Sequence, residues 1–353
     1  MKLHKEKHPL GGATKPWLVL ALALCLAIVA ITAQAQQQPL NIRIGHVAVP
    51  THLTPILFEK HELLKHYGQT YTVEPQRFSS SATQITALAS GQTDIVGLAP
   101  NSLGAAIQNA HIDDIRVIGD IYQDGVEGYY TANYLVRKDS PIHTVEDLKG
   151  KVLATSGVGS AQDTGIRTML RRHGLEDKRD YNLVEVQFQN MIATLREGKV
   201  DIGAPIPQGY YTAMKEGFAR VLFTQKDALG VTQMGFWVAR APFLEKNRAA
   251  LNDFFEDVVL SLHWFLDPAH RDEVIAMTAR FNKDSPDSYT DWMFGKRDFY
   301  RDPQARPNLD ALQANMQQVK DLGMLRGDAS IDIKKYSDLS FVDEATKRVG
   351  VMK

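Results

Sequence analysis

The stretches ITALASGQTDI (residues 85–95) and IATLREGKVDI (residues 192–202) are two copies of one pattern, offset by 107 residues. Each copy places apolar residues three apart, follows them with a glycine, and ends in an Asp-Ile pair. Apolar residues at that spacing share one helix face, the glycine suits the left-handed turn that ends a helix, and the β-branched isoleucine favours a strand. The repeat therefore predicts a duplicated helix, glycine turn and strand.

Polar residues just ahead of each copy predict where its helix begins. Ser81 and Gln84 stand three apart, as in a capping box, and Asn190 is the expected cap of the second copy. Strands are expected at 41–46, 134–137, 151–155 and 233–240, and a helix at 53–66. Thr144 with Asp147 should cap a short helix that stops at Gly150, and the turn GVGS at 157–160 should open a helix ending at Gly174. Beyond residue 240 the apolar spacing becomes helical throughout.

Strands alternating with helices indicate an α/β protein with a largely parallel sheet in each lobe. Binding loops in such sheets lie at the carboxyl ends of the strands, so we expect two Rossmann-like lobes with a ligand cleft between them and a helical C-terminal region.

The first 35 residues have the features of an export signal. Four lysines precede an apolar run at 17–31, and Ala33-Gln34-Ala35 supplies a cleavage site, so the mature chain should start at Gln36. An uncleaved anchor is the alternative, but the run is shorter than the roughly 20 residues of a spanning helix. A lipid-modified Cys25 is disfavoured because six more apolar residues follow it. We therefore expect a periplasmic protein.

The mature composition excludes several classes of protein. Removing 35 of the 353 residues leaves 318, enough for two lobes, and removes the one cysteine, so disulfides and thiolate chemistry are excluded. The leader carries four lysines and one glutamate, so its loss changes the net charge from −1 to −4. That mild acidity argues against a nucleic-acid partner.

Four segments in order carry a family resemblance: LVRKDSPIHTVEDLKGKVLA (135–154), the Gly-Ser turn at 157–160, ATLREGKVDI (193–202) and FLEKNRAALNDFFEDVV (243–259). Together they resemble the sulfonate, nitrate and taurine type of ABC solute-binding proteins, which shares its fold with thiamine-pyrimidine precursor proteins. The resemblance covers about residues 41–341. It implies a type II periplasmic-binding fold, with crossings between lobes near 136–139 and 235–240. Lobe one would comprise 36–137 and 240–353, and lobe two 138–239.

The resemblance also implies a function and a site. The chain would capture a small polar or singly anionic molecule (a sulfonate, carboxylate, aromatic acid or pyrimidine-like compound) and deliver it to an inner-membrane ABC permease, as a monomer without cofactor, metal or catalytic residue. The positions that match the family's ligand-gripping loops are Thr51, His52, Ser80, Ser81, Thr83, Asn101, Ser102, Gly159, Ser160, Gln162, Gln189 and Asn190.

The chemistry of these positions independently favours a ligand of low charge. Amides at a helix start lack intrahelical partners and carry partial positive charge, so the starts near Ser80 and Ser160 can bind an anion or a carbonyl. The same serines would also serve as caps, and His52 could either donate to the ligand or face solvent. These loops contain no charged residue, whereas a doubly charged anion or a metal ion would need one; Arg77 and Arg167 stand nearby.

Enzyme motifs are incomplete in this sequence. The turn at 157–159 lacks the third glycine of a dinucleotide fingerprint, where Gln162 stands, and no Gly-x-Ser-x-Gly elbow or His-Glu-x-x-His helix occurs. The alternative on the same fold is a pyrimidine-precursor synthase, whose cysteine-rich iron motif has no counterpart here. A sensor domain is a third class, but no output segment is attached. We therefore expect no enzyme activity.

Overall fold

The computed structural model describes residues 1, 38–325 and 330–352. The chain divides into a segment up to Pro39 and a body that starts at Leu40, and only the body is described here. The expected leader, Cys25 and the cleavage site after Ala35 lie outside the described residues. Within the described ranges, no helix combines the length and apolar character needed to cross a bilayer.

The body contains two five-stranded mixed sheets. The first has the order β2-β1-β3-β10-β4 and the second the order β7-β6-β8-β5-β9. The first sheet is built from β1 (Leu40–His46), β2 (Tyr71–Arg77), β3 (Ile95–Leu98), β4 (Ile115–Asp124) and β10 (Thr232–Arg240). The second is built from β5 (Asn133–Arg137), β6 (Val152–Thr155), β7 (Asn182–Glu185), β8 (Ile202–Gly203) and β9 (Ala219–Thr224).

The two sheets follow one plan. In the first, β1 pairs in parallel with β2 and β3, and β10 runs antiparallel between β3 and β4. In the second, β6 pairs in parallel with β7 and β8, and β5 runs antiparallel between β8 and β9. The duplication predicted from the repeat therefore extends over a whole lobe, and the expectation of an α/β protein with two Rossmann-like lobes is confirmed.

The repeated aspartate explains why the motif recurs. Asp94 accepts a hydrogen bond from the backbone amide of Arg43 at 2.9 Å, and Asp201 accepts one from Val152 at 2.9 Å. In return the amide of Asp94 donates to the Arg43 carbonyl, and that of Asp201 to the Val152 carbonyl. Each aspartate thus fixes the start of its own strand against the neighbouring parallel strand, which is β1 in the first sheet and β6 in the second.

Helices flank the sheets, and the repeat helices end where the pattern predicts. Gly91 and Gly198, just after the two repeat helices, have φ of +70° and +68°, which glycine adopts without strain. The helices are α2 (Thr54–Leu57), α3 (Ser81–Ala89), α4 (Pro100–Gln108), α5 (Ala161–Arg172), α6 (Phe188–Arg196), α7 (Pro207–Glu216), α8 (Gln225–Leu229), α9 (Ala241–Lys246), α10 (Arg248–Leu266), α11 (Arg271–Asn282), α12 (Asp287–Thr290), α13 (Leu309–Asp321) and α14 (Ser340–Val349). Short 3-10 turns occur at His61–Leu63, Glu146–Leu148, Pro268–His270 and Ile333–Tyr336.

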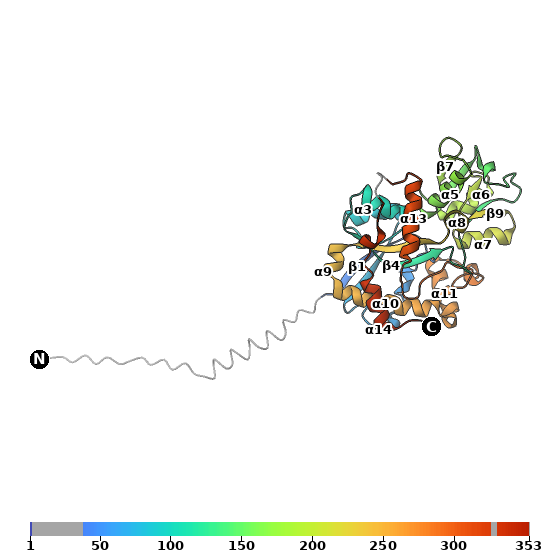
Figure 1. The fold of residues 1–353 in the computed structure, drawn as a ribbon. Helices are drawn as coiled ribbons and strands as arrows, with labels where there is room; N and C mark the ends of the chain where they lie inside the picture. Colours follow the sequence, from blue (N-terminus) through green and yellow to red (C-terminus); the bar gives the residue numbers. More distant parts are fainter. Residues whose placement is uncertain (2–37, 326–329, 353) are drawn as a thin grey trace. The chain divides into compact units, whose positions relative to one another are not determined.

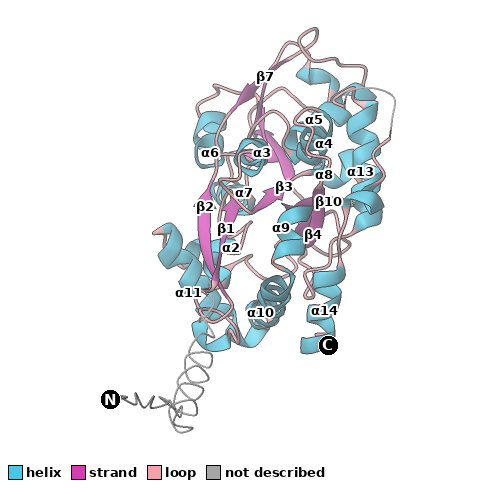
Figure 2. Cartoon of the chain, turned by 90° about the vertical axis from the view of Figure 1, so that its left-hand side faces the viewer, coloured by secondary structure: helices cyan, strands magenta, loops and turns pink. Residues whose placement is uncertain are grey.

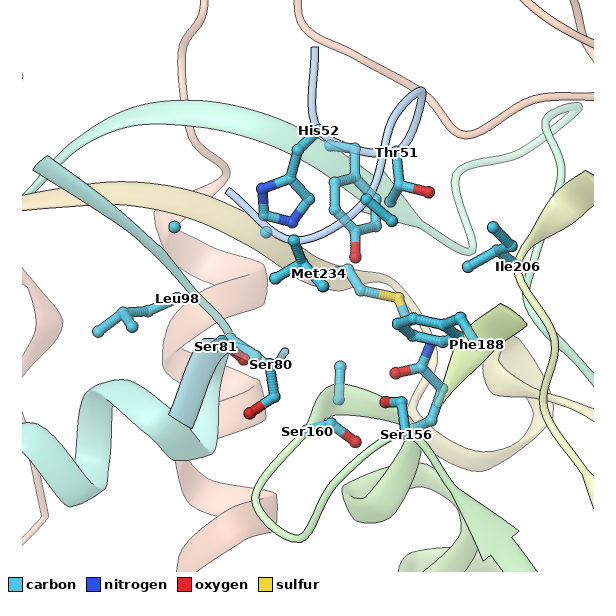
Figure 3. A pocket seen from close by; sticks show the side chains of 18 of the residues that line it. Thr51, His52, Ser80, Ser81, Leu98, Ser156, Ser160, Phe188, Ile206 and Met234 are labelled. Atoms are coloured by element: carbon cyan, nitrogen blue, oxygen red, sulfur yellow. The ribbon is translucent and has the colours of Figure 1, made fainter. Parts of the chain in front are cut away.

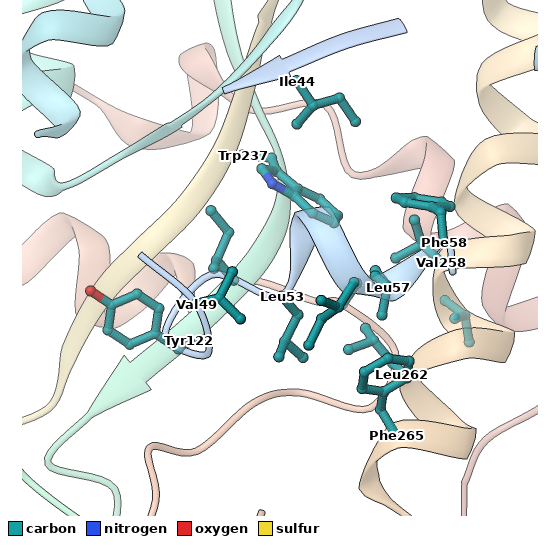
Figure 4. Close-up of a cluster of buried hydrophobic side chains, with 14 of the residues drawn as sticks. Ile44, Val49, Leu53, Leu57, Phe58, Tyr122, Trp237, Val258, Leu262 and Phe265 are labelled. Carbon is teal, nitrogen blue, oxygen red and sulfur yellow. The ribbon is translucent and has the colours of Figure 1, made fainter. Parts of the chain in front are cut away.

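Both faces of each sheet are buried. On β10, Trp237 joins the core formed with α10, whereas its neighbour Phe236 joins the core formed with α13, because successive strand residues point to opposite faces. In the second sheet, Tyr134 and Leu135 of β5 divide between two cores in the same way. Figure 4 shows Trp237, Phe58 and Val258 among the side chains of the α10 core.

The C-terminal part of the chain completes the first lobe. Helices α9, α10, α13 and α14 lie around β1 and β4, while α5, α6, α7 and α8 gather around β7 and β9 (Figures 1 and 2). Helix α10 packs against α14, and α13 packs against α4 and β10. The predicted helical C-terminal region therefore belongs to the sheet formed by the start of the chain.

Two predictions about helices were wrong, one about the length of a helix and one about a cap. The helix expected at 53–66 is only α2 and the 3-10 turn at 61–63. At its expected end, the amides of Lys65 and His66 donate to the buried carboxylate of Asp257 on α10 instead of to helix carbonyls. Asn190 is not the cap of its helix, which begins after Gln187.

The capping box of α3 is displaced by one residue from the predicted pair. It uses Ser80 and Thr83 rather than Ser81 and Gln84. The predicted partner, Gln84, is fully buried and pairs with both the amide and the carbonyl of Gly97 on β3, at 3.0 and 2.8 Å. That pairing takes the side chain away from the helix start.

Sheet membership also bears on the expected lobe boundaries at 137/138 and 239/240. Strand β5 belongs wholly to the second sheet and β10 wholly to the first. The chain therefore leaves the first sheet after Asp124 and enters the second at Asn133, and it returns between Leu229 and Thr232. Both junctions precede the expected ones by the length of a strand, because a sequence pattern does not reveal which sheet accepts an antiparallel strand.

Candidate functional site

An inner cavity of about 50 Å³ lies where the carboxyl ends of β1 and β3 meet the start of α5. Loops and strands of both sheets line it, which is the position expected for ligands in open α/β sheets. Figure 3 shows Ser80, Ser81 and Ser160 close together, with His52, Met234 and Phe188 around the same space. The full lining comprises Val47, Ala48, Thr51, His52, Ser80, Ser81, Gly97, Leu98, Ala99, Tyr122, Ser156, Ser160, Ala161, Gln162, Phe188, Ile206, Met234, Gly235 and Phe299.

The start of α5 contributes free backbone donors to this cavity. The Ser160 hydroxyl caps the helix by accepting from the amide of Asp163 at 3.1 Å, and it also contacts the Thr155 hydroxyl. The first amides, at Ala161 and Gln162, have no acceptor within the helix. Because both residues line the cavity, they offer it donors and the positive end of the helix dipole.

Two side chains of α4 connect the lobes beside the cavity. Asn101 donates through Nδ2 to the Ser160 carbonyl at 3.2 Å, and Ser102 donates to the Gly159 carbonyl at 3.0 Å. Asn101 and Ser102 are both buried. We call these two residues the latch, since they join the first lobe to the turn that opens α5.

His52 is a neutral hydrogen-bonding group in the cavity wall. It is 6% exposed, packs edge-on against Tyr122 with ring centroids 5.9 Å apart, and its Nδ1 has no hydrogen-bond partner among the described residues. Burial lowers the pKa of His52 to about 3, with smaller effects from His46 and Arg301. At neutral pH the ring is therefore uncharged and can donate or accept a hydrogen bond.

The lining carries no Lys, Arg, Asp or Glu. Arg167, which could have reached inward, is held by Asp163 and Asp177 at 2.6 Å each. Two carboxyl groups of β4 are buried outside the cavity lining, and burial raises the pKa of both Asp120 and Asp124 to about 7. The cavity is thus suited to a ligand with little charge and a substantial apolar surface.

The space between the lobes continues outward from this cavity. A second cavity of about 740 Å³ and a third of about 420 Å³ share Val47, Ala48 and Phe188 with the inner one. We call these two the outer cavities. Arg77 and Gln189 line both of them.

The structure distributes the predicted site residues among five settings. Six of them line the inner cavity and Gln189 lines the outer ones; the six are Thr51, His52, Ser80, Ser81, Ser160 and Gln162. Asn101, Ser102 and Gly159 take part in the latch contacts, and Thr83 caps α3. Asn190 is exposed and lines none of these cavities.

Sequence reasoning did not find the apolar walls. Met234 and Gly235 come from β10, Phe299 from the segment before α13, and Phe188 stands one residue ahead of the predicted Gln189. Apolar residues of this kind have no local signature that separates a cavity wall from a core. Only the sheet order, which inserts β10 beside β3, brings Met234 to the cavity.

One cluster of possible metal ligands occurs among the described residues. His66, Asp253 and Glu256 have ligand atoms within 4.8 Å of one another. Arg348 already pairs with Asp253 at 3.0 Å and with Glu256 at 3.2 Å, and Lys65 pairs with Glu256 at 2.8 Å. Since these cations compensate the carboxylates, the cluster is an ion-pair network between α10 and α14.

Sequence comparison finds one family model and one curated relative that each match more than half of the chain. Residues 72–269 match the family model described as NMT1/THI5 like. A protein of Escherichia coli (strain K12) named for binding aliphatic sulfonates is 28% identical over 266 residues, covering 74% of this chain and 77% of the relative.

Solved structures share the fold across most of the chain. The periplasmic aliphatic sulphonate binding protein SsuA from Escherichia coli has a TM-score of 0.66 at 21% identity, covering 85% of this chain and 97% of that one. The periplasmic nitrate-binding protein NrtA from Synechocystis PCC 6803 has a TM-score of 0.70 at 15% identity, covering 89% and 90%. The desulfurization enzyme DSZB has a TM-score of 0.62 at 15% identity, covering 88% and 99%.

Proposed function

Because the chain belongs to the NMT1/THI5-like family, we propose that it is the solute-binding component of an ABC importer and captures a small, polar or singly anionic organic molecule. The observation that carries this proposal is the inner cavity, whose wall is contributed by both lobes and contains no charged side chain. A molecule bound there would be surrounded by both lobes, as a transport receptor requires. The SsuA and NrtA structures, which have the same fold, support this role.

The lining favours a ligand with a polar end and an apolar body. Hydroxyl groups and free helix amides gather near Ser80 and Ser160, whereas Phe188, Met234 and Phe299 form an apolar wall. Sulfonates, carboxylates, aromatic acids and pyrimidine-like compounds have this character. Sugars would need many more hydrogen-bonding partners, and a metal ion would need carboxylate ligands.

An enzyme on the same fold is the alternative, and the resemblance to DSZB is the reason to weigh it. A general base is most effective when its pKa lies near the working pH, and burial lowers that of His52 to about 3. The Ser160 hydroxyl contacts the Asp163 amide and Thr155 rather than a base. These features favour binding without chemistry over a pyrimidine-precursor synthase or a hydrolase.

We place the mature protein in the periplasm, after cleavage following Ala35, with an inner-membrane permease as its partner. The lysine-rich start and the Ala-Gln-Ala sequence support export, and the periplasmic relatives support the location.

A thermal-shift screen tests the proposed function. A ligand that binds only the folded state, at 100 times its dissociation constant, adds roughly 2.7 kcal/mol of stability. We expect a rise in melting temperature with butanesulfonate, benzoate, benzenesulfonate or an aminopyrimidine, and none with glucose, a tripeptide or Zn²⁺. A screen in which a sugar or the metal gave the largest shift would contradict the proposal.

A further inference from the structure

The outer cavities contain the positive charge that the inner cavity lacks. Arg77 is the last residue of β2 and lines both outer cavities. Its guanidinium has no hydrogen-bond or ion-pair partner among the described residues. Lys283 also lines the larger cavity, where the one carboxylate in the wall is that of Asp284. Two cations against one carboxylate leave a single excess positive charge on this wall.

Strand pairing places a buried histidine beside Arg77. His46 ends β1 and is paired with Arg77 in the parallel register, so the two side chains emerge on the same side of the sheet. His46 lines the larger outer cavity, is 4% exposed, and its Nδ1 has no hydrogen-bond partner among the described residues. Burial and, next, the charge of Arg77 lower the pKa of His46 to about 4. The positive charge of Arg77 therefore acts on His46 in the cavity wall. At neutral pH the His46 ring is uncharged, and its Nδ1 is available to a ligand.

The second lobe presents a helix start to the same space. Helix α6 begins after Gln187, which makes no side-chain capping bond, and Phe188 and Gln189 line both outer cavities. The amides of these first residues have no acceptor within the helix and lie at the positive end of its dipole. A buried unpartnered histidine, an unpaired arginine and an uncapped helix start thus line one space.

The carboxylate of Asp284, in the wall of the larger outer cavity, already has hydrogen-bond partners. The Asp284 carboxylate accepts from the Tyr289 hydroxyl at 2.6 Å and from Gln208 Nε2 at 3.1 Å. Its charge is therefore tied to the Gln208 side of the cavity. A monoanion at the Arg77 side would meet donors and a cation, whereas a second negative charge would find no further unpaired cation there except Lys283.

We propose that the ligand spans the cavities, with its apolar body beside Phe188 in the inner cavity and its single negative charge in the outer cavity between His46, Arg77 and the start of α6. This assignment rests on the proposed solute-binding function. It names the ligand class as an organic monoanion whose acid group is directed outward. The serine cluster of the inner cavity then binds an uncharged polar part of the ligand.

Matched acids and amides test this orientation. Binding of butanesulfonate and butanesulfonamide, and of benzoate and benzamide, is measured by calorimetry in the wild type and in Arg77→Gln. We expect Arg77→Gln to weaken binding of the two acids about tenfold at low salt, as for the loss of one charge-assisted contact. Binding of the two amides should be unchanged. Added salt should weaken binding of the acids to the wild type more than binding to the variant.

Two further variants make the result decisive. Arg172→Gln removes the same charge from an exposed position of α5 whose guanidinium donates to the Asp227 carbonyl, outside these cavities, and should leave all affinities unchanged. Ser156→Ala, in the inner cavity, should affect an acid and its amide equally. If Arg77→Gln binds the acids normally while Ser156→Ala weakens only the acids, the charge lies inward: the orientation is overturned and the solute-binding function stands. If none of the four probes binds the wild type, both proposals fail for this ligand class.

Discussion

The latch formed by Asn101 and Ser102 offers a quantitative test of lobe closure. These side chains donate across the lobes at 3.2 and 3.0 Å, and both are buried. A net hydrogen bond of this kind contributes about 0.5–1.5 kcal/mol, so the Asn101→Ala/Ser102→Ala variant should lose about 1–3 kcal/mol of closed-state stability. That loss corresponds to a shift of roughly 5–150-fold in the ratio of closed to open protein.

The shift should be visible both in shape and in affinity. Without ligand, solution scattering should give a larger radius of gyration for the double variant than for the wild type, since the open form gains in population. Its affinity for any ligand of the closed state should fall by up to the same factor. Saturating ligand should restore the compact form, because contacts such as that of the Tyr211 hydroxyl with the Arg297 carbonyl, at 2.7 Å, remain.

Asn190→Ala is the matched control for the latch, since it removes an amide from an exposed position that lines none of the three cavities. It should scatter and bind like the wild type. If the latch variant also had wild-type scattering and affinity, the contribution assigned to these two hydrogen bonds would be refuted.

Three other predictions concern stability and processing. Gln84→Ala leaves the buried amide and carbonyl of Gly97 without their side-chain partners, so it should lower the free energy of unfolding by about 2–4 kcal/mol in urea titrations. The exposed control Gln92→Ala should change the free energy of unfolding by less than about 0.5 kcal/mol, and equal effects of the two variants would contradict this account. Burial raises the pKa of Asp124 to about 7, from about 4 in the unfolded chain, so the folded state holds the extra proton. The contribution of Asp124 to stability should therefore fall by roughly 1–4 kcal/mol as pH rises from 4 to 7. Asp124→Asn should reduce the measured slope and leave the part due to Asp120, and an unchanged slope would argue against the assignment. Protein expressed with its leader should have an intact mass and N-terminal sequence beginning at Gln36, and a retained leader or a lipid on Cys25 would overturn the export proposal.

The repeat was predictable from the sequence because its signals are local. Apolar spacing and the glycines at 91 and 198 depend on residues within one helical turn, as does the cap at Ser160 outside the repeat, and the structure has each of them. The role of Asp94 and Asp201 was not foreseen, since their partners lie on strands about 50 residues earlier in the sequence. The local sequence pattern thus predicted each helix, glycine turn and strand, whereas the contacts between neighbouring strands became visible only in the structure.

The failures have tertiary causes. The expected end of the helix at 53–66 is not helical, because Asp257, on a helix about 190 residues later, accepts hydrogen bonds from the amides of Lys65 and His66. The capping box lies one residue before the predicted pair, because the Gln84 side chain binds the backbone of Gly97 on β3 instead of the helix start. In the cavity, helix starts and hydroxyl residues were predictable, whereas Met234 and Phe299 reach it only through the order of strands and the return of the chain to lobe one.

The central claim is that the protein binds a small organic monoanion and leaves it unchanged. Equilibrium dialysis against butanesulfonate or benzoate, followed by mass spectrometry of the released compound, tests both parts in one measurement. The account predicts saturable binding of about one molecule per chain and recovery of the same compound after prolonged incubation. Formation of a product, or no saturable uptake of either acid at millimolar concentration, would contradict it.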